Sequence, residues 1–190
     1  KLASTTSESI QIGRTFGNIL VASGKGATAF ADVYRFYIFQ NSQTGTMNFP
    51  SASSADKDLT LKRLWCTSDS AITVVSGGDL TITEGIKIDY NNSFQATGTT
   101  TAKNFNLANN GNLNLGGNTL ILSNASEGLT SATGTTINAG PGCTIRGSNA
   151  STRFQSQGHW EIVGNIENLN VINEELAVFG KVTNCTGDIH

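Results

Sequence analysis

Short apolar pairs that alternate with polar residues recur along the second half of the chain. Between residues 107 and 145, pairs such as Leu113/Leu115 and Leu120/Leu122 place aliphatic side chains two positions apart, and Gly, Asn, Ser and Thr fill the gaps. A spacing of two is that of a β-strand, whereas an amphipathic helix needs apolar residues at i, i+3 and i+4. Turns that contain Gly or Asn close each pair. Short strands that repeat between tight corners predict an all-β fold, a right-handed β-helix or related β-solenoid.

The same rhythm extends on both sides of this stretch. Before it, Gly77-Gly78 and Glu84-Gly85 read as turns between short strands; after it, the rhythm is interrupted at 146–154 and then resumes. Three strands per turn of the coil, with roughly 20 to 25 residues per turn, would stack Leu120, Ile145 and Leu169 at one corner. We therefore predict a solenoid domain over 59–190, preceded by an N-terminal arm and attachment or intersubunit region over 1–58.

The most aromatic stretch of the chain falls in that N-terminal region. Residues 33–40 read VYRFYIFQ, which is apolar on both faces of a strand. Strands of this kind are buried on both sides or lie in an interface. The candidate intersubunit residues are Tyr34, Phe36, Tyr37 and Phe39.

Composition narrows the possible function classes. The 190 residues include 21 Gly, only 14% are charged, and the net charge is −2. Disordered chains of low hydrophobicity normally carry high charge, so ordinary disorder is not expected. The scattered Lys and Arg residues give no basic surface for nucleic acid, and no apolar run reaches the ~18 residues that would predict membrane insertion. The absence of an initiator Met and of a signal sequence suggests a processed product or a fragment.

Neither the cysteines nor the glycine clusters indicate a cofactor. Cys66, Cys143 and Cys185 are odd in number, widely spaced and form no metal-ligand motif with histidine. Buried single thiols in a reducing compartment are the expected state. Gly116-Gly117 and Gly140-Pro141-Gly142 lack the Lys-Ser/Thr of a phosphate loop, and we interpret them as corners. We expect no metal and no cofactor.

One cluster suggests ligand binding, and none suggests catalysis. His159, Trp160 and Glu161 combine an aromatic ring with polar neighbours, which suits a sugar; alternation would instead turn Trp160 inward as a core residue and leave the other two outward. Glycoside hydrolysis uses two carboxylates at a set separation, and no acidic pair stands out from charges at solvated corners. No catalytic residue is therefore predicted.

Three segments resemble bacteriophage tail fibres, tailspikes and related virion proteins. They are LNLGGNTLILSN (113–124), GTTINAGPGCTIRG (134–147) and ENLNVINEELAVFGKVTN (167–184). The last of them has the succession of strand, Asn corner, strand and Gly corner that is typical of fibre β-helices and β-prisms. The resemblance implies a non-enzymatic structural protein of the virion, assembled as a homotrimer in the bacterial cytoplasm. Its partners would be other virion proteins and, in a receptor-binding role, a polysaccharide of the host surface.

Two alternatives remain open. A surface polysaccharide depolymerase would carry acidic residues on one solenoid face or between subunits. A secreted adhesin similar to autotransporter passengers would lie outside the cell on the bacterial surface. That family tends to avoid cysteine, so the three cysteines of this chain count against it.

Overall fold

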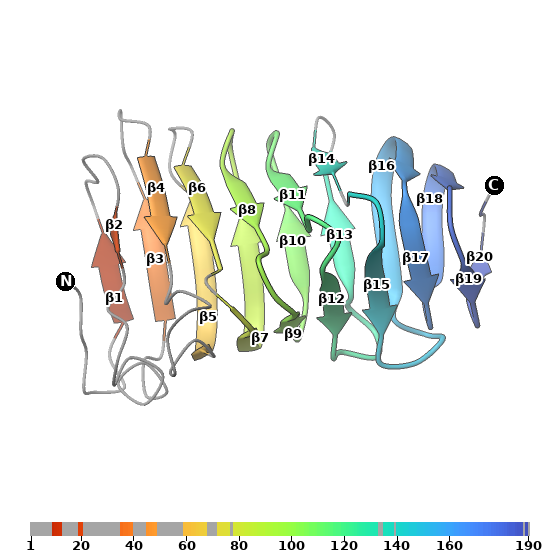
Figure 1. Cartoon of the computed structure of the whole chain (residues 1–190), viewed down its shortest axis with the longest axis horizontal. Helices are drawn as coiled ribbons and strands as arrows, with labels where there is room; N and C mark the ends of the chain where they lie inside the picture. The colour runs from red at the N-terminus through yellow and green to blue at the C-terminus, as the bar shows by residue number, and fades with distance from the viewer. Residues whose placement is uncertain are drawn as a thin grey trace.

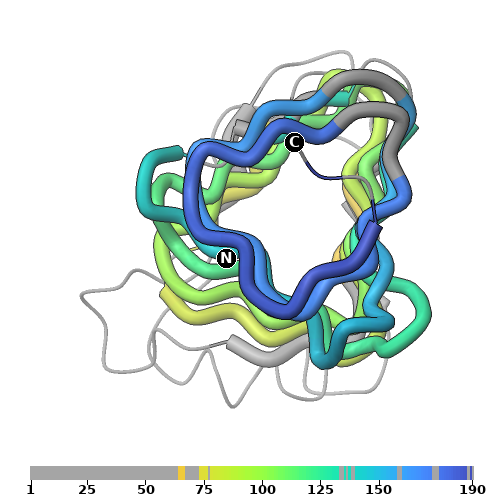
Figure 2. The backbone as a smooth tube through the Cα atoms, turned by 90° about the vertical axis from the view of Figure 1, so that its right-hand side faces the viewer, coloured from red at the N-terminus to blue at the C-terminus, as the bar shows by residue number. Residues whose placement is uncertain are grey.

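The computed structural model shows an elongated stack of parallel β-strands (Figure 1). It describes residues 9–12, 19–20, 35–39, 45–48, 59–67, 72–76, 78–132, 135–138, 140–187 and 189. Every regular element within these ranges is a strand, and none is a helix. The predicted all-β solenoid is therefore confirmed. The strands lie side by side along the long axis, and in the end view successive turns of the chain superimpose around a common interior (Figure 2).

The strands form three ladders, one on each side of the coil. The first side holds β9 (Thr100–Ala102), β12 (Thr119–Leu122), β15 (Cys143–Gly147), β17 (Gly164–Glu167) and β19 (Val182–Thr183). The second holds β1 (Ser9–Ile12), β3 (Arg35–Phe39), β10 (Phe105–Leu107), β13 (Leu129–Ser131), β16 (Arg153–Ile162), β18 (Asn170–Val178) and β20 (Thr186–Gly187). The third holds β2 (Ile19–Leu20), β4 (Gly45–Asn48), β6 (Ile72–Val75), β8 (Ser93–Gln95), β11 (Asn112–Asn114) and β14 (Thr136–Asn138).

Two long strands connect the first and second sides. β5 (Leu59–Thr67) pairs with β7 (Leu80–Ile88), and β7 pairs with both β9 and β10. The prediction of a turn at Glu84-Gly85 was wrong, because β7 bends round this corner without ending. The bend coincides with a register shift in the β5–β7 pairing. At Gly85 a Cβ would lie 2.0 Å from Asn104 Oδ1, so the corner of the next turn requires glycine here.

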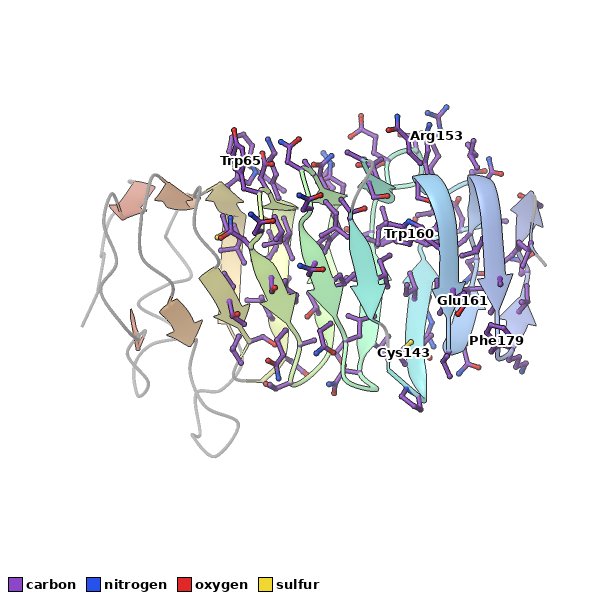
Figure 3. The ribbon with its side chains drawn as sticks, turned by 90° about the horizontal axis from the view of Figure 1, so that it is seen from above. Trp65, Cys143, Arg153, Trp160, Glu161 and Phe179 are labelled. Carbon is purple, nitrogen blue, oxygen red and sulfur yellow. The ribbon has the colours of Figure 1, made fainter. Side chains whose placement is uncertain are left out.

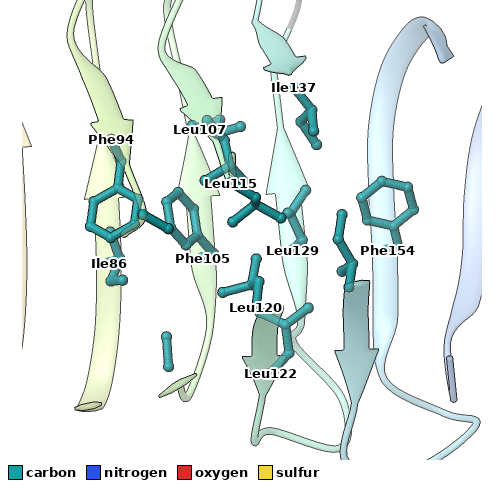
Figure 4. Packing of buried hydrophobic residues seen from close by; sticks show 14 of the residues in the cluster. Ile86, Phe94, Phe105, Leu107, Leu115, Leu120, Leu122, Leu129, Ile137 and Phe154 are labelled. Atoms are coloured by element: carbon teal, nitrogen blue, oxygen red, sulfur yellow. The ribbon is translucent and has the colours of Figure 1, made fainter. Parts of the chain in front are cut away.

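The interior is filled by columns of side chains from successive turns (Figure 4). On the second side, Ile86, Phe105, Leu129 and Phe154 are paired in register and almost fully buried. Phe94 of β8 meets Phe105 edge-on, with ring centroids 5.5 Å apart. Stacking of this kind removes apolar side chains from water, at ~25 cal/mol per Å², and the ladders satisfy the backbone N–H and C=O groups. The core is thus continuous from Leu64 to Leu176.

One predicted column was only partly right. Leu120 does stack on Ile145, but the next residue in that column is Ile166 and not Leu169. The turn from Ile145 to Ile166 has fewer residues than the turn before it. A constant number of residues per turn therefore leads to a position beyond Ile166. Leu169 is also buried, at the following corner just before β18.

The same column contains a polar residue, Thr100, between Leu80 and Leu120. Its side chain is fully buried, and its hydroxyl has no hydrogen-bond partner within the described part of the chain. A hydroxyl buried in this way costs free energy of folding.

Asparagine forms several of the corners. Asn109, Asn110, Asn168 and Asn184 have positive φ values of 42° to 67°, a conformation that asparagine adopts more readily than other residues with a side chain. Asn184 Nδ2 also donates to Asn168 Oδ1 at 2.8 Å across two successive turns. These contacts explain the high asparagine content at the ends of the strands.

The pairing also crosses the predicted domain boundary. β3 pairs with β5, and β4 pairs with β6, so the second and third ladders contain strands from both sides of that boundary. A distinct attachment role for residues 1–58 stays a prediction.

Candidate functional site

The predicted sugar contact lies on β16, and the structure separates its residues. Trp160 is 6% exposed and meets Phe154 edge-on, with centroids 5.9 Å apart. Glu161 is exposed, and for His159 only the backbone is described, paired with Glu175. In Figure 3 the labels of Trp160 and Glu161 stand on one strand. The alternation argument is confirmed for Trp160, which belongs to the core. Sugar binding at these residues stays a prediction, and the buried indole offers it no free ring face.

The predicted intersubunit residues lie at the start of the coil. Tyr34 falls outside the described residues. In β3, Phe36 occupies the register position of buried Leu64, and Tyr37 that of half-buried Trp65. Phe39 pairs with Thr67. Their part in a subunit contact remains a prediction.

The thiols, by contrast, are placed as expected. Cys66 and Cys143 are fully buried and form no disulfide, and Cys185 is half-buried. Burial raises the pKa of the Cys143 thiol to about 11, against a weaker opposing hydrogen bond from the backbone of Asn165. A thiol that stays protonated and buried is inert.

Two features are absent from the described ranges, a metal-ligand cluster and a membrane-spanning helix. No group of three or more His, Cys, Asp and Glu residues there is arranged to hold a metal ion. None of the described segments is a helix with the length and apolar character to span a bilayer.

One buried carboxylate stands out, at the corner after β7. Asp89 is 5% exposed; it receives hydrogen bonds from Asn109 Nδ2 at 2.7 Å and the Tyr90 N–H at 2.8 Å, and an ion pair from Lys87 at 3.0 Å. Burial alone would raise the pKa of Asp89, but the contacts with Lys87, Asn109 and Tyr90 together hold it below its usual 3.8. Its partners come from two successive turns, so Asp89 fastens one corner to the next.

A polar cleft of about 340 Å³ lies on the outer surface of the second side. Its floor consists of Asn106, Thr130 and Gln155, which pair in register on β10, β13 and β16 and point outward between buried neighbours. With strands ~4.8 Å apart, the floor spans about 10 Å. Asn106 Nδ2 donates to Thr130 Oγ1 at 2.8 Å and joins two of its members.

The walls of the cleft come from the corner before these strands. Asn104, Ser126, Glu127, Gly128 and Arg153 line it. Asn104 Nδ2 donates to Glu127 Oε2 at 3.3 Å, so these two wall residues are linked to each other. Gly128 lies between Asn104 and Arg153 in the register, and a Cβ there would lie 2.1 Å from the Arg153 carbonyl oxygen, so glycine is required where these two turns approach closely.

A buried threonine fixes the loop that forms the wall. The hydroxyl of Thr152, which is fully buried, donates to the carbonyl of Asn124 at 3.1 Å, and Asn124 Oδ1 accepts the Ser126 N–H at 3.1 Å. Ser148 Oγ lies 3.2 Å from the same hydroxyl. The loops 123–128 and 148–152 are therefore tied together, and the cleft is formed before any ligand arrives.

The lining chemistry favours binding over catalysis. The lining residues include one carboxylate, Glu127, and one guanidinium, Arg153, whereas glycoside hydrolysis by the usual route needs two carboxylates. None of the lining residues is aromatic. The sequence analysis missed this cleft, because Asn106, Thr130 and Gln155 become neighbours only once the register is known.

The comparisons with known proteins add no relative. No protein family, no curated protein and no solved structure matches the chain. A function must therefore be argued from the architecture and the surface of the chain itself.

Proposed function

We propose that this chain is a stiff structural element of a bacteriophage virion, part of a tail fibre, spike or surface decoration, which acts as a homotrimer. The observation that supports it is the uninterrupted parallel ladder of the second side. From β1 it passes through β3, β5, β7, β10, β13, β16 and β18 to β20. At ~4.8 Å per step, this is a rod about 40 Å long.

The interior supports a mechanical role. Leu, Ile and Phe make up most of the described core, and its buried polar or charged residues are Ser76, Asp89, Asn92, Thr100, Thr152 and Ser156. Such a rod gains stability turn by turn from its nearest-neighbour contacts. Stiffness is the property that a fibre or spike requires.

The thiols and the surface agree with this role. Cys66 and Cys143 are buried and form no disulfide, which suits folding in a reducing bacterial cytoplasm before release of the particle. Exposed apolar side chains gather toward the C-terminal end, at Val163, Phe179 and Val182. They are candidates for burial against sister chains.

Mass spectrometry of purified particles tests the virion role. Phage particles would be prepared on a density gradient from the host whose genome encodes the chain, and the cell envelope would be analysed in parallel. The proposal expects peptides of this chain in the particle band at a fixed ratio to the capsid protein. Peptides found only in the envelope fraction would contradict it and support the adhesin alternative.

A further inference from the structure

Two exposed arginines on neighbouring strands differ in their surroundings. Arg146 of β15 forms an ion pair with Glu167, with Nε 2.5 Å from Oε2. No side-chain hydrogen bond or ion pair joins Arg153 of β16 to another residue that the structure describes. Arg153 stands at the edge of the polar cleft and projects from the side of the molecule on which Trp65 also lies (Figure 3). An exposed cation that has no side-chain partner among the described residues, at the edge of a cleft, is available to an anionic ligand.

The floor beside this cation retains unused hydrogen-bonding groups. The Thr130 hydroxyl accepts from Asn106, so its own proton can be donated outward. Asn106 Oδ1 remains an acceptor, and the amide of Gln155 can both donate and accept. Glu127 uses one oxygen on Asn104 and has the other for a ligand hydroxyl. Donors and acceptors thus alternate along about 10 Å of the floor.

The geometry points to a binding site for a carboxylated saccharide, with the carboxylate on Arg153 and the sugar hydroxyls on Asn106, Thr130, Gln155 and Glu127. The inference deepens the proposed function and rests on it, since a particle-borne rod would meet acidic glycans at a host surface. Arginine binds carboxylates through two parallel N–H···O bonds, which makes it the specificity element here.

Two features favour a sugar acid over an acidic peptide. The lining has no apolar or aromatic side chain to bury the side chains of a peptide. The floor also lies across ladder strands whose main-chain groups are already paired, so it cannot add a peptide strand. Amides, a hydroxyl and a carboxylate instead match the hydroxyl groups of a pyranose.

Isothermal titration with trigalacturonic acid tests the site, with its methyl ester as the uncharged counterpart. The acid is expected to bind and the ester to bind at least about tenfold more weakly, because a charge-assisted contact contributes ~1.5–3 kcal/mol. Arg153→Gln should weaken binding of the acid by a similar factor. Arg146→Gln is the matched control, and it should change binding less than about twofold. Circular dichroism checks that both variants are folded.

Several results would overturn the inference. The first two are that the parent protein does not bind the acid, or that it binds acid and ester equally. The other two are that both arginine variants weaken binding equally, or that a triaspartate peptide binds more tightly than the sugar acid. Sedimentation of the same samples separates this inference from the proposed function, a stiff trimeric shaft. A trimer that does not bind overturns the site alone, and a monomer that binds overturns the shaft alone.

Discussion

The unpartnered hydroxyl of Thr100 gives a direct test of how the core is stabilised. Replacing Thr100 with valine keeps a β-branched side chain of similar shape on β9 and removes the buried hydroxyl. In proteins, a buried hydroxyl without a partner costs ~1–3 kcal/mol. Since Leu80 and Leu120 flank the site in the column, Thr100→Val is expected to raise the free energy of unfolding by about 1–2 kcal/mol.

Thr152 provides the matched control. It is buried to the same extent, but its hydroxyl donates to the Asn124 carbonyl at 3.1 Å and lies 3.2 Å from Ser148 Oγ. Thr152→Val would leave the Asn124 carbonyl without this donor, so it should lower the free energy of unfolding by ~1–3 kcal/mol. Thr100→Ser keeps the hydroxyl and deletes a methyl group, and a loss of about 1 kcal/mol is expected.

Calorimetric and urea unfolding of the parent and the three variants measures these effects. For a chain of this length, 1 kcal/mol corresponds to a shift in Tm of about 2–4 °C. The expected order of Tm values is Thr100→Val above the parent, and the parent above both Thr100→Ser and Thr152→Val. If both valine variants lowered Tm equally, the argument from the unpaired hydroxyl would be refuted.

Three further predictions concern acid stability, thiol reactivity and the close approach of two turns. The folded pKa of Asp89 lies below 3.8, so the stability that its carboxylate contributes is present above the pKa of the unfolded chain and is lost as pH falls through the lower folded value. Asp89→Asn should therefore lower Tm at pH 7 and flatten the acid side of a plot of Tm against pH. An unchanged acid side of the plot would contradict this prediction. Iodoacetamide at pH 8 should alkylate half-buried Cys185 faster than buried Cys143, whose pKa is raised to about 11. Peptide mass spectrometry measures the two rates. Equal rates in the native protein would show that the interior opens. Gly164→Ala would place a Cβ 2.3 Å from Cys143 Sγ, so a loss of about 2 kcal/mol or more in urea unfolding is expected; a variant as stable as the parent would show that β15 and β17 do not approach so closely.

The sequence was informative wherever one local signal decided the outcome. Leu113 and Leu115 alternate with the polar Asn112 and Asn114, and both leucine side chains are buried in the interior as predicted. The placement of Trp160 also followed from alternation alone. These features depend only on the two-residue period of a strand, which can be read within a few positions.

Longer-range features depended on the length of each turn, which composition does not determine. Ile166 and Leu169 are both apolar and both buried, so only the pairing shows which of them follows Ile145. The dipeptide Glu84-Gly85 likewise does not distinguish a bend within β7 from a turn that would end the strand. Register in Gly-rich strands is weakly specified by sequence.

The cleft shows the same limit for function. Its floor draws Asn106, Thr130 and Gln155 from three separate turns, and each is an ordinary outward polar residue in the sequence. Arg153 lay in a segment that was interpreted only as an interruption of the repeat. Such a site is visible only once successive turns are aligned, because no single strand contains it.

The central claim, a stiff shaft made of three chains, is tested most directly by sedimentation of the purified protein at micromolar concentration. One chain has a mass of 20.0 kDa, so a trimer would sediment at about 60 kDa and with the high frictional ratio of an elongated particle. A mass of 20.0 kDa over the whole micromolar range would contradict the account.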